Sequence, residues 1–159
     1  AEKVILVEGA AEYIILPAIY EKVVGSRLEA DGIEIISMGS ISYERYRKIA
    51  ESLNKKVAVI TDNDGKDEQY NNTDLFSIFS DSNCDNWTLE VAFYNKNTEF
   101  FDEKYKNKQT KAEYDGKTMA KACAHMLKNK TENALLIEKE IDSLSLPEYL
   151  IEAVQWIKE

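Results

Sequence analysis

The chain has little cysteine and histidine, which excludes several common ways of building a site. Its two cysteines, Cys84 and Cys123, show no CxxC spacing, so the sequence indicates neither a zinc finger nor a disulfide framework. Two such thiols are typical of buried or unpaired cysteines in a reducing cytosol, and we therefore expect a cytoplasmic protein. The single histidine, His125, lies in a predicted helix and is interpreted as structural.

Long apolar runs are also missing. No stretch approaches the ~20 apolar residues that a membrane span requires, and residues 4–7 form too short a run for a signal peptide, because Glu8 ends it. We find no Walker A motif, internal repeat or low-complexity segment. The 159 residues are enough for one domain with a core. Because the chain starts almost directly on an apolar run, we expect it to be a fragment of a longer protein.

The chain lacks the excess of positive charge that marks most nucleic-acid-binding proteins, since its net charge is −9. This does not exclude such a role, because bound metal ions invert the field of a carboxylate cluster. One basic patch, residues 104–108 with Lys111, contains an aromatic residue. The favoured interpretation of this patch is a solvated loop.

Two acidic signatures follow apolar runs and are the most informative feature. The first run, VILV, ends in Glu8 and Gly9, with Glu12 close behind; the second, VAVIT, ends in Asp62 and Asp64 before Gly65. Such runs predict buried parallel strands, and ligands of parallel sheets bind beyond the carboxyl ends of the strands. Carboxylates that converge there need a cation, and their oxygens suit Mg²⁺ or Mn²⁺.

The first part of the sequence alternates strand and helix patterns, which predicts right-handed βαβ units. The expected elements are a strand over 3–7, a helix over 11–24, a strand over 33–37, a helix over 42–53 and a strand over 56–61. Pro17 lies inside the first helix, where it should cause a kink or mark an irregular first turn. Gly25 and Asn54 should end the two helices.

The remaining sequence is less regular. We expect a short helix over 74–79, a fourth strand over 87–90, an inserted helical portion over 95–145 with a helix over 116–128, and a last helix with Ser145 as N-cap. The predicted fold class is therefore α/β, with a parallel sheet of about four strands, flanking helices and a C-terminal helical portion.

At the first signature, Gly9 permits close approach of a ligand, and Glu12 lies one helical turn from Glu8. Glu12 could equally be a first-turn residue that stabilises the helix dipole. At the second, Asp62 and Asp64 alternate on an extended segment, so both can reach one cation. A D-x-D pair alone is also common in ordinary turns.

These segments together resemble a toprim domain with a Rossmann-like sheet, and in particular the nucleases of the OLD (overcoming lysogenization defect) family, whose relatives include Gabija-type defence nucleases. The resemblance rests on residues 6–17 (LVEGxxE with LP), on 61–65 (TDNDG), and on three further segments: 37–43, 88–90 (TLE) and 130–153 (KTENAL and PEYL). Lys66 stands where topoisomerases have a third aspartate, which favours the nuclease branch.

The resemblance implies an Mg²⁺- or Mn²⁺-dependent endonuclease or nickase, in phage defence or DNA processing, that cleaves DNA by a two-metal mechanism. It assigns five metal ligands, Glu8, Glu12, Asp62, Asp64 and Glu90, of which Glu8 and Asp62 are also catalytic. Thr88 and Gly9 have supporting roles. Lys130 would stabilise charge on the phosphate, although a helix-end lysine is usually solvated and Lys117 is a rival for this role.

The same resemblance implies that the 159 residues form a single toprim domain joined to an ATPase domain elsewhere in the protein. It leaves a homodimer open and implies no membrane partner. The alternatives are a non-catalytic toprim scaffold for assembly, a topoisomerase- or primase-type phosphotransfer domain, and a receiver-like domain. Retention of the acidic residues argues against the scaffold, while Glu8 and the TLE segment argue against the receiver.

Overall fold

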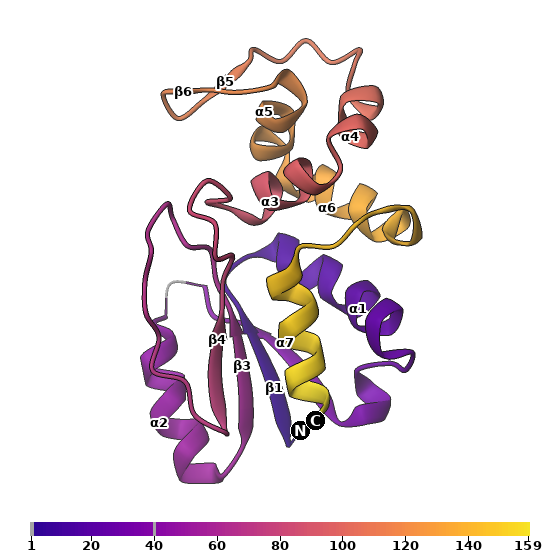
Figure 1. The fold of residues 1–159 in the computed structure, drawn as a ribbon. Coiled ribbons are helices and arrows are strands. Elements are labelled where there is room, and N and C mark those ends of the chain that lie inside the picture. Colours follow the sequence, from indigo (N-terminus) through magenta and orange to yellow (C-terminus); the bar gives the residue numbers. More distant parts are fainter. Residues whose placement is uncertain (1, 40) are drawn as a thin grey trace.

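A parallel sheet of four strands lies at the centre of the computed structural model, which describes residues 2–39 and 41–159 (Figure 1). The strands are β1 (Lys3–Val7), β2 (Ile33–Ser37), β3 (Lys56–Ile60) and β4 (Phe76–Phe79), in the order β2-β1-β3-β4. Every neighbouring pair is parallel. The predicted α/β class with about four parallel strands is confirmed.

Helices cover both faces of this sheet. The helices α1 (Ala10–Val24) and α7 (Glu148–Lys158) share a core with the side chains of Ile5 and Val7 on one face. The helix α2 (Tyr43–Leu53) packs on the other face, where Val4 and Leu6 point. Side chains that alternate along β1 thus enter two different apolar layers, as a strand buried on both faces requires.

A second group of elements lies beyond the carboxyl ends of the strands, in the upper part of Figure 1. In chain order these are α3 (Leu89–Lys96), α4 (Thr98–Lys104), the hairpin β5 (Glu113–Tyr114) and β6 (Lys117–Thr118), α5 (Lys121–Lys128) and α6 (Lys130–Lys139). Two 3₁₀ turns, Glu29–Asp31 and Ile141–Ser143, complete the chain. The apolar core that contains Ile5 continues into these helices through Phe93 and Met126, so both parts share one interior.

The elements of the first half agree with the sequence prediction to within one residue at each end. Gly25 (φ 90°) and Asn54 (φ 53°) adopt the left-handed conformation that ends α1 and α2. Ser42 caps α2 by accepting a hydrogen bond from the backbone N–H of Glu44. Helix α1 runs without interruption through Pro17, whose ring is exposed. Ser40, in the 37–43 segment, lies outside the described residues.

Two predicted elements between residues 74 and 90 are wrong. Residues 76–79 form the edge strand β4 instead of a short helix, because Phe76 and Ile78 bury their side chains against the sheet in register with β3. Residues 87–90 are not a strand. Thr88 is the N-cap of α3, and its hydroxyl accepts a hydrogen bond from the N–H of Val91 at 3.3 Å.

Two further predictions fail nearer the C-terminus. The helix expected over 116–128 begins only at Lys121, because Asp115 (φ 50°) and Gly116 (φ 76°) form the tight turn between β5 and β6. Two consecutive positive φ angles are characteristic of a hairpin turn, which Asp-Gly favours. Ser145 does not cap α7; its backbone N–H instead donates to Oδ1 of Asn97 at 2.7 Å, and α7 starts after Pro147.

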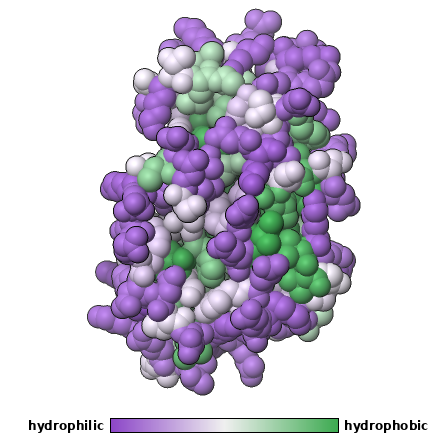
Figure 2. Space-filling model, in the orientation of Figure 1, coloured by the Kyte–Doolittle hydropathy of each residue, from purple (hydrophilic) through white to green (hydrophobic). Residues whose placement is uncertain are grey.

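Polar and charged side chains occupy most of the face in Figure 2, apart from a hydrophobic area beside α7. Within the residues described, no helix is both long and apolar enough to cross a membrane.

One buried tyrosine gives the fold a defined dependence on acid. The hydroxyl of Tyr20, which is fully buried, donates to Asp31 at 2.7 Å, and Ser26 donates to the same carboxylate oxygen at 2.5 Å. These hydrogen bonds, from Ser26 first and then Tyr20, lower the pKa of Asp31. A carboxylate with a lowered pKa stabilises the fold above its unfolded pKa of about 3.9, and this stabilisation is lost as the pH falls.

We therefore expect the wild-type protein to lose more stability than Asp31→Asn between about pH 5 and pH 2. Urea unfolding at a series of pH values measures the difference. Equal losses in both proteins would show that Asp31 does not contribute in this way.

Candidate functional site

The two acidic signatures meet at one edge of the sheet. Glu8 and Asp62 follow β1 and β3, which are direct neighbours with Val7 opposite Ile60. After β1 the chain crosses to β2 on one side of the sheet, and after β2 it crosses back to β3 on the other side. The site is therefore a topological switch point, where a crevice opens between neighbouring strand ends.

Glu8 is exposed but held by its neighbours. The hydroxyl of Thr61, at the end of β3, donates a hydrogen bond to Oε1 of Glu8. Gly9 leaves room for the next acidic residue, because a Cβ atom added there would lie 3.0 Å from Oε2 of Glu12. The absence of a side chain at residue 9 thus lets the Glu12 carboxylate lie against the backbone that follows Glu8.

Asp62 is tied to the start of α3. Its Oδ1 accepts a hydrogen bond from the backbone N–H of Leu89 at 3.1 Å. The N–H of Asp64 donates to the carbonyl of Trp87 at 3.3 Å, which connects the same two segments a second time. A carboxylate at a helix N-terminus is favoured by the unpaired N–H groups there.

Glu90 enters the site from the first turn of α3. It is 3% exposed, and its Oε1 lies 3.9 Å from Nζ of Lys130. Lys130 is the first residue of α6, which packs against α1. The packing of α6 on α1 therefore brings Lys130 to the edge that holds Glu8 and Asp62, where it meets Glu90 of α3.

The side chains of Glu8, Glu12, Asp62 and Glu90 are called here the carboxylate cluster, and the charges of its members contribute to the raised pKa values of Asp62 and Glu12. Burial, and then the charges of Glu12, Glu90 and Glu8, raise the pKa of Asp62 to about 8. Burial also raises the pKa of Glu12, with smaller contributions from Glu90 and Glu8. Burial raises the pKa of Glu90, while Lys130 opposes the change. The cluster contains more negative charge than Lys130 can neutralise.

The donor set of this cluster fits a hard divalent cation, because it consists of carboxylate oxygens that repel one another. However, no group of three or more histidine, cysteine, aspartate or glutamate side chains in residues 2–39 and 41–159 is arranged so that it could hold a metal ion. The individual carboxylates are instead held by Thr61, by the Leu89 N–H and by Lys130.

Two of the residues singled out in the sequence lie at the margin of the cluster. Asp64 is exposed and in the left-handed conformation (φ 54°) at the turn before Gly65, and its charge is a minor contribution to the raised pKa of Asp62. Nζ of Lys117 lies 3.9 Å above the ring of Trp87. Lys117 thus contacts an aromatic ring, whereas Lys130 contacts a carboxylate.

Sequence reasoning gave no role to Thr61 or Asn63. Asn63 is 4% exposed, and its amide donates to the carbonyls of Asp81 at 2.9 Å and Asn83 at 3.0 Å. Its Oδ1 accepts from the N–H of Gly65 at 2.8 Å. Asn63 therefore joins the acidic loop to residues 81–86. The only signal in the sequence is an asparagine between two aspartates, which is equally typical of an ordinary turn.

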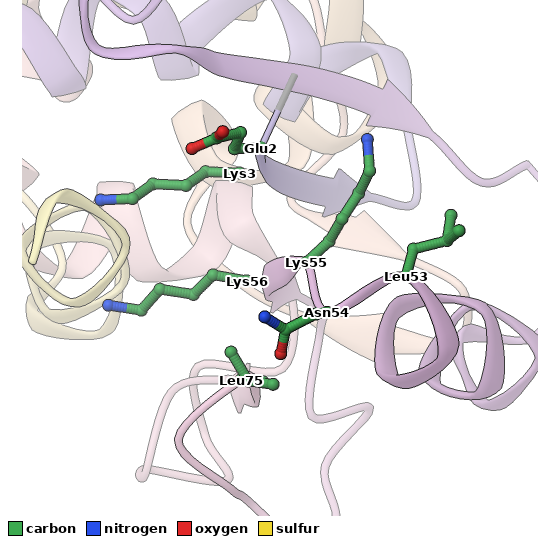
Figure 3. Close-up of a pocket in the computed structure, with 7 residues that line it drawn as sticks. All are labelled: Glu2, Lys3, Leu53, Asn54, Lys55, Lys56 and Leu75. Carbon is green, nitrogen blue, oxygen red and sulfur yellow. The ribbon is translucent and has the colours of Figure 1, made fainter.

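A pocket of about 680 Å³ lies at the opposite end of the sheet and does not include the cluster (Figure 3). Two of its lysines anchor α7: Lys56 donates to the carbonyl of Trp156 at 2.6 Å, and Lys3 donates to that of Lys158 at 2.9 Å. Cations at a helix C-terminus satisfy unpaired carbonyls and complement the helix dipole. We interpret these two lysines as structural.

Residues 1–64, which contain Glu8, Glu12, Asp62 and Asp64, match the family model "Overcoming lysogenization defect protein-like, TOPRIM domain". The predicted resemblance is confirmed. Searching curated protein sequences gives no match to this chain.

Solved structures of OLD proteins have the same fold over nearly the whole chain. The C-terminal region of the Xanthomonas campestris pv. campestris OLD protein is 21% identical, with a TM-score of 0.65, covering 99% of this chain and 92% of that one. The corresponding region of the Burkholderia pseudomallei OLD protein is 18% identical, with a TM-score of 0.61 and coverage of 99% and 97%. The similarity therefore includes α3 and α6, which lie outside the OLD-like TOPRIM match.

Proposed function

We propose that this OLD-like TOPRIM domain is a metal-dependent endonuclease or nickase that hydrolyses phosphodiester bonds of DNA. The observation that carries the proposal is the convergence of four carboxylates with a raised Asp62 pKa at the switch point of the sheet. Perturbed groups at such a position are typical of functional sites. The TOPRIM fold is in general used for metal-dependent phosphoryl transfer on nucleic acids, which agrees with this chemistry.

Five residues would hold Mg²⁺ or Mn²⁺: Glu8, Glu12, Asp62, Asp64 and Glu90. Two bound ions would supply stabilisation of the attacking and leaving oxygens. The chain itself orients the ligands: Thr61 holds Glu8, and the capped N-terminus of α3 holds Asp62 and positions Glu90. We further propose an ATPase domain of the same protein as partner and phage defence or DNA processing as the setting.

The test is cleavage of supercoiled plasmid by the purified chain. We expect nicked or linear product with Mn²⁺ or Mg²⁺ and none with EDTA. Product formation in EDTA at the same rate would contradict the metal requirement. Absence of product with every divalent ion tested, from a folded protein that binds DNA, would favour the scaffold alternative.

Lys130 is proposed to stabilise negative charge on the phosphate, because its ammonium group lies beside Glu90 with its side chain 48% exposed. We expect Lys130→Ala to lower the cleavage rate at saturating DNA by about 100-fold. Lys117→Ala is the matched control, since this lysine faces Trp87, and it should lower that rate much less. Single-turnover plasmid nicking compares the two. A larger loss of cleavage rate for Lys117→Ala than for Lys130→Ala would show that Lys117, and not Lys130, stabilises the charge on the phosphate.

A further inference from the structure

Positive charge in this acidic chain is concentrated in one stretch, residues 104–130, called here the lysine-rich segment. It contains eight lysines and only two acidic residues, Glu113 and Asp115. The rest of the chain holds 12 basic and 27 acidic residues. The net charge of −9 therefore hides a strong separation of charge between the two parts.

All eight lysines of the segment are exposed, because the fold buries other residues of the same elements. In α5, residues 122–127 are buried and Lys121 and Lys128 remain outside. Ion pairs use only part of this charge. Lys106 pairs with Glu103 at 2.6 Å and Lys108 lies 3.8 Å from Glu132. Lys130 lies 3.9 Å from Glu90. Lys104, Lys111, Lys117, Lys121 and Lys128 form no ion pair with any residue that the structure describes, and all five are exposed.

The lysine-rich segment adjoins the carboxylate cluster at two points. Its last residue, Lys130, lies 3.9 Å from Glu90. In its hairpin, Lys117 lies over the ring of Trp87, whose carbonyl accepts the N–H of Asp64. Figure 1 shows the hairpin, α5 and α6 beyond the carboxyl ends of the strands, so the basic surface and the acidic edge belong to the same end of the molecule.

We infer that the lysine-rich segment binds the phosphate backbone of DNA and leads it to the carboxylate cluster. The inference rests on the proposed function, since it assigns the surface that holds that substrate. A phosphodiester that reaches Glu90 must approach an edge with excess negative charge, and the remainder of the chain would repel it. The lysines beside that edge supply the compensating attraction, which is the electrostatic requirement of nucleic-acid binding.

The test compares two triple variants in the 159-residue chain. Lys104→Ala/Lys111→Ala/Lys128→Ala removes three exposed lysines of the segment. Arg45→Ala/Lys48→Ala/Lys139→Ala removes three exposed basic residues elsewhere. Fluorescence anisotropy with a labelled DNA duplex in EDTA, over a range of salt concentrations, measures binding without cleavage. Thermal melting verifies that both variants are folded.

We expect the first variant to bind about tenfold or more weakly at low salt, with a plot of log K against log [salt] whose slope is smaller by two to three, since each phosphate contact contributes about 0.9. The second variant should bind DNA about as well as wild type. Equal weakening by both variants, or no salt-dependent DNA binding by the wild-type chain, would overturn the inference. Displacement of the duplex by polyglutamate at equal charge concentration would overturn it in favour of an acidic protein partner.

The DNA-binding measurement and the cleavage assay can fail independently of each other. Binding that depends on the lysine-rich segment, without cleavage under any divalent ion, supports the surface and contradicts the nuclease proposal. Cleavage with unchanged binding in the first variant supports the nuclease and contradicts the surface.

Discussion

Replacing Asp62 by alanine should reduce metal-dependent plasmid cleavage by at least about 1,000-fold, and Glu8→Ala should have a similar effect. Both carboxylates follow neighbouring strands and would be direct ligands of the proposed metal ions, so removing either one takes a ligand from the site. The loss should appear in the rate at saturating DNA, because the variants retain the lysine-rich segment. Gel analysis of nicking over time gives this rate.

Asp67→Ala is the matched control, because it removes an exposed carboxylate from the same acidic loop. It should cleave at a rate close to wild type. Asp62→Asn is a second variant that keeps an oxygen to accept the Leu89 N–H, so loss of cleavage in a normally folded protein can be assigned to the carboxylate. Unchanged cleavage in both Glu8→Ala and Asp62→Ala would show that these two carboxylates do not form the site of cleavage.

Asn63→Ala should lower the free energy of unfolding by about 1–3 kcal/mol, since it removes a buried side-chain amide together with the hydrogen bonds that it donates to three backbone carbonyls. The Asn63 amide donates to Asp81 and Asn83 at 2.9 and 3.0 Å, and to Asn86 at 3.3 Å. These bonds connect the loop that carries Asp62 to the segment that leads into α3. The consequence should be a less ordered site as well as a less stable protein.

Urea unfolding measures this change, and Asn107→Ala is a control at an exposed asparagine, expected within about 0.5 kcal/mol of wild type. A midpoint for Asn63→Ala equal to that of wild type would show that the bonds from Asn63 add nothing to stability.

The first half of the fold could be predicted because its signals are local and strong. The apolar runs VILV (4–7) and VAVI (57–60) are typical of buried strands. Gly25 and Asn54 end their helices in the left-handed conformation, which few residues adopt. The meeting of Glu8 with Asp62 followed directly, since parallel strands share one carboxyl edge.

The second half depends on contacts that are distant in sequence. Strand β4 is only four residues long, and its identity comes from pairing with β3. The sequence of the TLE segment predicts a strand, whereas in the structure Thr88 is the N-cap of α3 and the following residues are helical. The Asp115-Gly116 pair is a local signal for the hairpin turn between β5 and β6. Tertiary packing of α6 on α1, which no local pattern contains, places Lys130 beside Glu90.

The site, like the fold, combines features with local sequence signals and features that depend on contacts between distant segments. The carboxylates were predictable from strand ends and from the resemblance to OLD-type TOPRIM domains. The hydrogen bond from Thr61 to Glu8 and the amide contacts of Asn63 depend on side-chain geometry between neighbouring loops. These contacts matter because they decide how the carboxylates are held.

The central claim is that the carboxylate cluster binds divalent metal. The most direct measurement is a crystal of the chain soaked in Mn²⁺, with data collected for anomalous scattering. We expect anomalous density among Glu8, Asp62 and Glu90, which disappears in crystals of Asp62→Ala. Strong anomalous density elsewhere on the molecule, with none at these three side chains, would contradict it.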